Sequence, residues 1–177
     1  MKKIISILLV FVFCIGLMNP IAALADSANM PTATLEGVTD VTSEGTLKVS
    51  YYLEGTGIYG VEGYFEYDDA KLTLQSVSKA EGSPWDVLYN EANRKFVAMS
   101  YSGTEINNKT EVFVAEFTVA KLNVGETIDV SCIGMLVSLN EDEDVRISDC
   151  TYAATVTEPF ETVSDFEVDT YDSGTAY

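Results

Sequence analysis

The segment Gly60–Tyr67, GVEGYFEY, constrains the fold more than any other part of the chain, because its side chains alternate between two kinds. Glu62, Tyr64 and Glu66 fall on one side of an extended chain, and the small or apolar residues between them fall on the other. Such a strand buries one face and presents an acidic row, broken by one aromatic ring, to solvent. The pattern predicts a half-buried β-strand.

A polar corner follows this strand. Asp68 and Asp69 end it, since short acidic side chains accept hydrogen bonds from nearby backbone N–H groups. We expect one tight turn that delivers Leu72 to the core, and then a second strand that ends at Val77.

The same alternation recurs along the chain, and no window of helical length has an apolar period of 3.6 residues. Turn residues separate the apolar runs, and Gly134 falls inside one run as an expected bulge. About nine strands are predicted: Thr32–Val38, Thr46–Leu53, Gly60–Tyr67, Leu72–Val77, Trp85–Tyr89, Lys95–Tyr101, Glu111–Ala120, Thr127–Leu139 and Cys150–Val156. Polar loops are expected at Asp40–Gly45 and Asn140–Asp144. The fold class is therefore all-β, with two sheets packed as a sandwich.

Three parts of the chain differ in composition. Residues 1–25 have a basic start, an apolar run and an Ala-Leu-Ala cleavage site, which is typical of a secretory signal peptide; an uncleaved N-terminal anchor is the alternative. The apolar run is short for a membrane span, which needs roughly 20 residues. Residues 30–157 hold the strands of a single domain, and residues 158–177 are acidic without alternation, which predicts a flexible tail.

Composition excludes several functions. The chain has 28 acidic and 10 basic residues, a formal net charge of −18, and this repels nucleic acid and anionic membranes. It has no histidine, which removes histidine-based triads and imidazole metal sites. The acidic run Glu141–Asp144 lacks the spacing of a calcium-binding loop. We expect no catalytic residue, metal site or cofactor.

Cysteine and aromatic residues supply the remaining candidates. Cys132 and Cys150 are either a disulfide or two buried thiols, and their spacing fits no metal or redox motif. The single tryptophan, Trp85, is predicted to lie in the core. Tyr64 and Tyr89 are candidate exposed rings, which could stack on sugar or be buried against a protein partner.

Three segments resemble one family of modules. GYFEYDDAKLTLQSV, EVFVAEFTVAK and NVGETIDVSCIGMLVSLNEDEDVRISDCTYAATV resemble, in order and spacing, strands of the cohesins, which are bacterial scaffold modules of cellulosomes. The resemblance covers Thr32–Val156. It implies a nine-stranded jelly-roll sandwich, which agrees with the strand count obtained from alternation.

The resemblance also implies a partner and a contact surface. Cohesins bind calcium-loaded dockerins, mainly through a face that corresponds here to Gly60–Tyr67, Trp85–Tyr89, Lys95–Tyr101 and Thr127–Leu139. The family's outward polar contact position falls on Glu62, and by parity Tyr64 and Glu66 continue the row. With Tyr89, these residues form the predicted partner-binding set. The implied protein is a secreted, extracellular docking module of a Gram-positive bacterium, in an assembly that degrades polysaccharides.

Two alternatives to the docking module stay open. One is a carbohydrate-binding module that binds polysaccharide on the same sandwich, and the other is a structural, adhesin-like domain of the cell surface. Fold alone does not choose among these functions.

Overall fold

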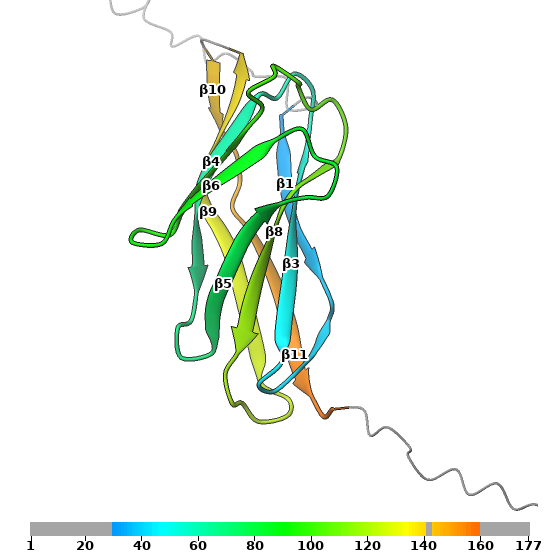
Figure 1. Cartoon of the computed structure of the whole chain (residues 1–177), viewed down its shortest axis with the longest axis vertical. Coiled ribbons are helices and arrows are strands. Elements are labelled where there is room, and N and C mark those ends of the chain that lie inside the picture. The colour runs from blue at the N-terminus through cyan, green and yellow to red at the C-terminus, as the bar shows by residue number, and fades with distance from the viewer. Residues whose placement is uncertain (1–29, 141–142, 160–177) are drawn as a thin grey trace, which may run out of the picture. The chain divides into compact units, whose positions relative to one another are not determined.

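Two β-sheets pack face to face in the computed structural model, which describes residues 30–140 and 143–159 (Figure 1). The four-stranded sheet has the order β1 (Thr32–Gly37), β3 (Thr46–Glu54), β8 (Thr110–Val119), β5 (Leu72–Lys79). The seven-stranded sheet has the order β2 (Asp40–Thr42), β11 (Cys150–Thr157), β9 (Thr127–Asn140), β4 (Gly60–Tyr67), β7 (Lys95–Met99), β6 (Asp86–Asn90), and β10 (Glu143–Arg146) pairs with β9 beside this path. The described residues contain no helix, so the predicted all-β sandwich is confirmed.

The predicted strands are present, and two short ones are added to them. β2 lies where a polar loop was expected and pairs in parallel with β11 through three residues. β10 begins at Glu143 and pairs antiparallel with β9, so Glu143 and Asp144 belong to a strand and not to the expected acidic loop. Both strands are polar, which is why alternation did not identify them.

Some predictions lie outside the described residues: the signal peptide at 1–25 and nearly all of the tail at 158–177. Within the described ranges, no helix is long and apolar enough to cross a membrane.

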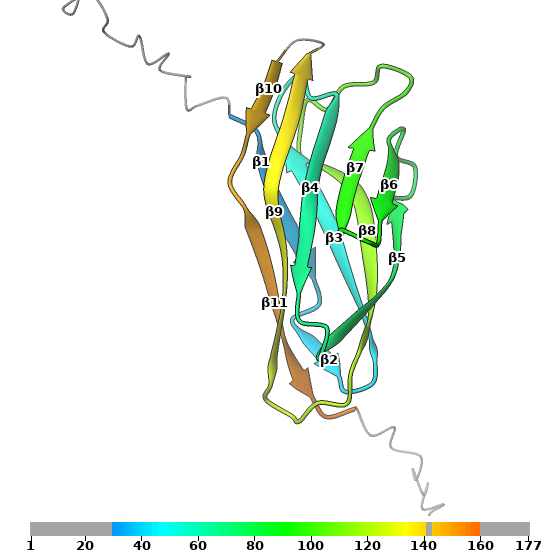
Figure 2. The same cartoon turned by 90° about the vertical axis from the view of Figure 1, so that its left-hand side faces the viewer.

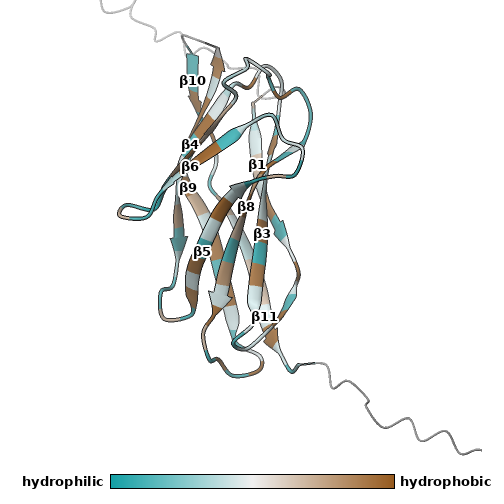
Figure 3. Ribbon diagram, in the orientation of Figure 1, coloured by the Kyte–Doolittle hydropathy of each residue, from teal (hydrophilic) through white to brown (hydrophobic). Residues whose placement is uncertain are grey.

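Alternation along the strands builds the core between the sheets, and Figure 3 shows it as apolar and polar bands along each ribbon. On β3 the inward residues Leu47, Val49, Tyr51 and Leu53 are fully buried. The Tyr51 ring stacks on Phe113 with centroids 4.7 Å apart. Each buried side chain of this size stabilises the fold by about 1.5–3 kcal/mol.

Trp85 lies in this core, as predicted, although it precedes β6 instead of belonging to it. Its indole N–H donates a hydrogen bond to the carbonyl oxygen of Thr104 at 2.9 Å, so burial leaves the polar atom paired.

The polar corner after β4 forms as expected. The Asp68 side chain accepts a hydrogen bond from the Ala70 N–H at 2.9 Å, and its carbonyl oxygen accepts from the Leu72 N–H at 2.9 Å. Leu72 is thereby placed in the core, 1% exposed. Arg94, in the turn between β6 and β7, stabilises this corner. Its guanidinium pairs with Asp69 and lies 4.2 Å from the centroid of the Tyr67 ring.

The expected bulge at Gly134 is confirmed, and it changes which side chains of β9 face outward. Glu62 pairs with Leu136 and Tyr64 with Ile133, so β9 has one residue more than β4 between these pairs. Gly134 has a φ of 61°, which a glycine adopts without strain. The bulge lets Cys132 and Met135, three positions apart, both face the core.

Candidate functional site

The outer face of the seven-stranded sheet carries three of the four predicted partner-binding residues. Figure 2 shows β10, β9, β4, β7 and β6 side by side on this side of the molecule. On β4, Glu62, Tyr64 and Glu66 point outward, while Val61 and Phe65 are buried. The parity predicted from the sequence is therefore correct, and we call this surface the outer face.

Strand register places apolar side chains around Glu62. One row across the face runs from β6 to β10 through Leu88, Val97, Glu62, Leu136 and Arg146. In the next row Tyr64 lies between Lys95 and Ile133. The centre of the face is a mixture of aliphatic side chains, one ring and a few charges, as in the core of a protein–protein interface.

Lys95 connects the charged and aromatic parts of the face. Its ammonium lies 2.9 Å from the Glu62 carboxylate and 5.9 Å from the centroid of the Tyr64 ring. The hydrogen bond with Glu62 raises the pKa of Lys95, and the charge of Glu62 adds to this. On its other side, the Tyr64 ring lies over the bulge, where a Cβ at Gly134 would be 3.5 Å from it.

Two exposed apolar side chains lie on this face, and two more lie at its end. Seven large ones are exposed in the described ranges, and Tyr64 (38%) and Leu88 (59%) are on the face itself. Tyr59 and Tyr101 flank its end, beside the first residue of β4 and the last residues of β7. A patch of this kind, with charged residues around it, is typical of an interaction surface.

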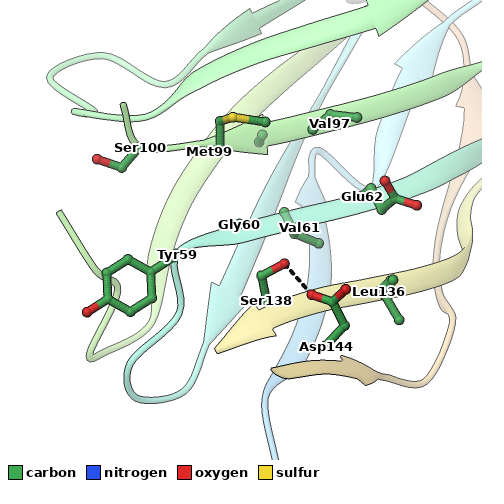
Figure 4. A pocket seen from close by; sticks show the side chains of 11 residues that line it. Tyr59, Gly60, Val61, Glu62, Val97, Met99, Ser100, Leu136, Ser138 and Asp144 are labelled. Carbon is green, nitrogen blue, oxygen red and sulfur yellow. Dashed lines mark hydrogen bonds between the residues drawn. The ribbon is translucent and has the colours of Figure 1, made fainter. Parts of the chain in front are cut away.

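A groove of about 330 Å³ crosses the outer face at Gly60 (Figure 4). Val97 and Met99 of β7 line one side, and Leu136 and Ser138 of β9 line the other. Gly60 leaves its floor open, since a Cβ there would lie 3.7 Å from the nearest atom, the Ala98 carbonyl oxygen. Asp144 of β10 stands at the rim and accepts a hydrogen bond from the Ser138 hydroxyl at 2.6 Å.

Tyr89 does not share the outer face with the other predicted residues. It follows the outward Leu88 in an alternating strand, so it faces inward, and its ring meets Phe65 edge-on at 5.9 Å between centroids. Burial, with Tyr67 beside it, raises the pKa of Tyr89 to about 12. The structure thus brings Glu62, Tyr64 and Glu66 together and leaves Tyr89 on the inner side.

The sequence prediction missed the aliphatic members of the face. Leu88, Val97 and Leu136 lie in strands that have apolar residues on both sides, as in KFVAM, so alternation gives no parity. The polar Lys95 at the start of β7 was the available signal, because counting from it by twos reaches Val97.

Cys132 and Cys150 lie directly opposite each other on β9 and β11, with Cys132 fully buried. Both are free thiols in this structure, so the disulfide stays a prediction. Burial raises the pKa of Cys132, and the hydrogen bond that its thiol donates lowers the pKa of Cys150. The pair lies on the core side of the sheet, away from the outer face.

Nothing in the described ranges gathers three or more histidine, cysteine or acidic side chains around a point that could hold a metal ion. Two residues of the acidic run, 141 and 142, lie outside those ranges. The expectation that the chain is not an enzyme stays a prediction.

Comparison with known proteins gives a fold and no sequence relative. No protein-family model and no curated protein sequence matches the chain. A cohesin module from a family 33 glycoside hydrolase of Clostridium perfringens matches in structure with a TM-score of 0.65 and 16% identity, covering 74% of this chain and 99% of the module. A non-cellulosomal cohesin from the archaeon Archaeoglobus fulgidus has a TM-score of 0.57 and 14% identity, covering 72% and 91%.

A third similar structure contains a partner. It is the third ScaB cohesin of R. flavefaciens in complex with a group 1 dockerin, with a TM-score of 0.55 and 16% identity, covering 72% of this chain and 96% of that one. At these identities the likeness concerns the fold. The chain has the fold of the cohesin modules.

Proposed function

We propose that this chain is a non-catalytic docking module that binds a dockerin-type protein through the outer face of the seven-stranded sheet. The single observation that carries the proposal is that the exposed Tyr64 and Leu88 share one face of the sandwich with the half-buried Val97 and Leu136. The cohesin fold, and a similar cohesin solved with a dockerin, support the choice of partner.

Each part of the face has a distinct role in this proposal. Tyr64 is the anchor, because a ring held from one side by Lys95 and from the other by the bulge loses little freedom on binding. Leu88, Val97 and Leu136 supply aliphatic contact around it. Glu66 lies toward the rim, where a charge contributes little to affinity.

Docking to a protein accounts for the face better than sugar binding does. Sugar stacks on flat rings, whereas aliphatic side chains in the middle of a sheet are what a protein surface buries. Export through residues 1–25, and assembly with polysaccharide-degrading proteins, complete the proposal and rest on the sequence alone.

The test is calorimetric titration of the chain without residues 1–25 against a panel of dockerin modules, each with calcium and with a chelator. We expect at least one dockerin to bind with micromolar affinity or better in calcium, and chelation to abolish its binding. Failure of every calcium-loaded dockerin, with both proteins folded, would refute the proposed function.

A further inference from the structure

The groove at Gly60 has two chemically different parts. Its walls are the apolar side chains of Val97, Met99 and Leu136, on two strands that flank the bare backbone of Gly60. Its rim carries the carboxylate of Asp144, which Ser138 holds toward the groove (Figure 4). Ser100 and Ser138 also line the groove, so it combines an apolar stretch with polar groups and a carboxylate at its rim. Such a groove fits a side chain that has an apolar stem and a cationic end.

The two acids beside the groove differ in their partners. Glu62 already pairs with Lys95 at 2.9 Å. Asp144 has one oxygen bonded to Ser138, and among the described residues no lysine or arginine forms an ion pair with it. Burying Asp144 under a docked protein would therefore leave an uncompensated carboxylate unless the partner brings a cation.

We propose that the groove receives one lysine or arginine side chain of the docked protein, with its methylene stem along Val97, Met99 and Leu136 and its charged head on Asp144. Such side chains bury an apolar stem while the charge remains at a polar site. The inference rests on the proposed function, which it sharpens by naming what the partner must present. Gly60 becomes the residue that sets specificity, because a long side chain there would fill the groove.

A small-molecule arm tests the groove without a dockerin. Nα-acetyl-lysine N-methylamide and the norleucine equivalent, which has the same number of side-chain carbons but no charge, are titrated into the chain at equal concentration, and backbone amide NMR shifts are measured. We expect shifts at Gly60, Val97 and Leu136 that are at least threefold larger for the lysine compound and decrease with added salt. Equal responses, or no response at these amides, would overturn the proposal.

Two variants extend this arm, each with a matched control on the four-stranded sheet. Gly60→Leu fills the groove and should remove the response to both compounds, and Ser50→Leu adds the same side chain to the opposite surface. Asp144→Asn keeps an acceptor for Ser138 but removes the charge, so the lysine response should fall to the norleucine level, and Glu116→Gln is its control. A lysine response that survives both groove variants would refute the assignment.

The dockerin arm uses whichever calcium-loaded dockerin binds. Gly60→Leu should weaken binding about a hundredfold and Asp144→Asn about tenfold, while both controls should leave the affinity unchanged, with melting temperatures followed for all four. If a dockerin binds and tolerates both groove variants, the groove assignment fails and the proposed function stands. If the lysine compound binds in the groove and no dockerin binds, the proposed function fails and the groove assignment stands.

Discussion

The two outward surfaces of this sandwich enclose the same core, yet their compositions differ. The outward surface of the four-stranded sheet consists mainly of threonine, serine and paired charges, with Lys48 and Glu116 3.2 Å apart at its centre, and it includes the half-buried Tyr52 and Val114. The outer face of the seven-stranded sheet presents Tyr64, Leu88 and a row of half-buried aliphatic residues. Among the described residues, none of the exposed large apolar side chains lies on the strands of the four-stranded sheet.

This difference is informative because folding does not require it. Inward positions are set by the core in both sheets, and polar outward positions suffice to solvate the four-stranded sheet. The apolar residues of the outer face therefore need another explanation, and burial against a partner supplies one.

The largest effect is expected from a charge placed at the centre of the outer face. Val97 and Val114 are half-buried valines that face outward from the two sheets. Val97→Glu should weaken dockerin binding about a hundredfold or more, since a buried unpaired carboxylate opposes docking. Val114→Glu should leave affinity unchanged, and each variant should cost about 1 kcal/mol of folding stability. Calorimetric titration and chemical unfolding measure both, and equal losses of affinity would abolish the distinction between the surfaces.

A second comparison uses two tyrosines. Tyr64→Ala removes the proposed anchor and should weaken binding about thirtyfold, equivalent to about 2 kcal/mol. Tyr52, on the four-stranded sheet beneath the Lys109 ammonium, is the matched ring, and Tyr52→Ala should have no effect on affinity. Calorimetric titration of both variants against one dockerin measures the two affinities. An unchanged affinity for Tyr64→Ala would show that Tyr64 is not the anchor of the interface.

A third prediction contrasts the two sides of β4 itself. A Cβ at Gly63 would lie 2.8 Å from Cζ of Phe96 and 3.0 Å from Cγ of Met135, both in the core. Overpacking of this kind costs about 1–3 kcal/mol, partly offset by the loss of glycine's freedom in the unfolded chain, so Gly63→Ala should destabilise folding by about 1 kcal/mol. Gly60→Ala has room in the groove and should be neutral or stabilising. Chemical unfolding of both variants measures this, and equal stabilities would contradict the assignment of sides.

A fourth prediction concerns the inward Tyr89 and applies only at alkaline pH. Its pKa is raised to about 12 in the folded protein, against about 10 in an unfolded chain. Because the raised pKa belongs to the folded state, this contribution to stability is complete below about pH 10 and is lost as pH rises toward 12. Tyr89→Phe should therefore show a smaller loss of stability between pH 10 and 12 than the wild type. Chemical unfolding at several alkaline pH values tests this. If the variant and the wild type had the same pH dependence of stability, the Tyr89 hydroxyl would be exposed to solvent and its pKa would not be raised.

Most of the fold was predictable because the core repeats a simple signal. Strict alternation identified β4, fixed the outward positions of Glu62 and Tyr64, and located the bulge through a lone glycine. β2 and β10 were not predicted because they are short and polar. They are strands because they pair with β11 and β9, and their own sequences do not indicate it.

The candidate site was predictable only on β4. In β6 and β7 apolar residues occur on both sides and only polar residues at the strand ends indicate parity, so Tyr89 was placed with the site although its neighbour Leu88 is the outward residue. The groove depends on the registers of β7, β4 and β9 and on β10, which carries Asp144 at the rim. Such long-range pairing is a property of the assembled sheet.

The central claim is that a partner docks on the outer face and leaves the four-stranded sheet free. Methyl cross-saturation from a bound, calcium-loaded dockerin measures this directly in one sample, because the methyl groups that touch the partner lose intensity. The account predicts losses at Leu88, Val97 and Leu136, with Val114 unchanged. Losses at Val114 together with unchanged signals from those three residues would contradict it.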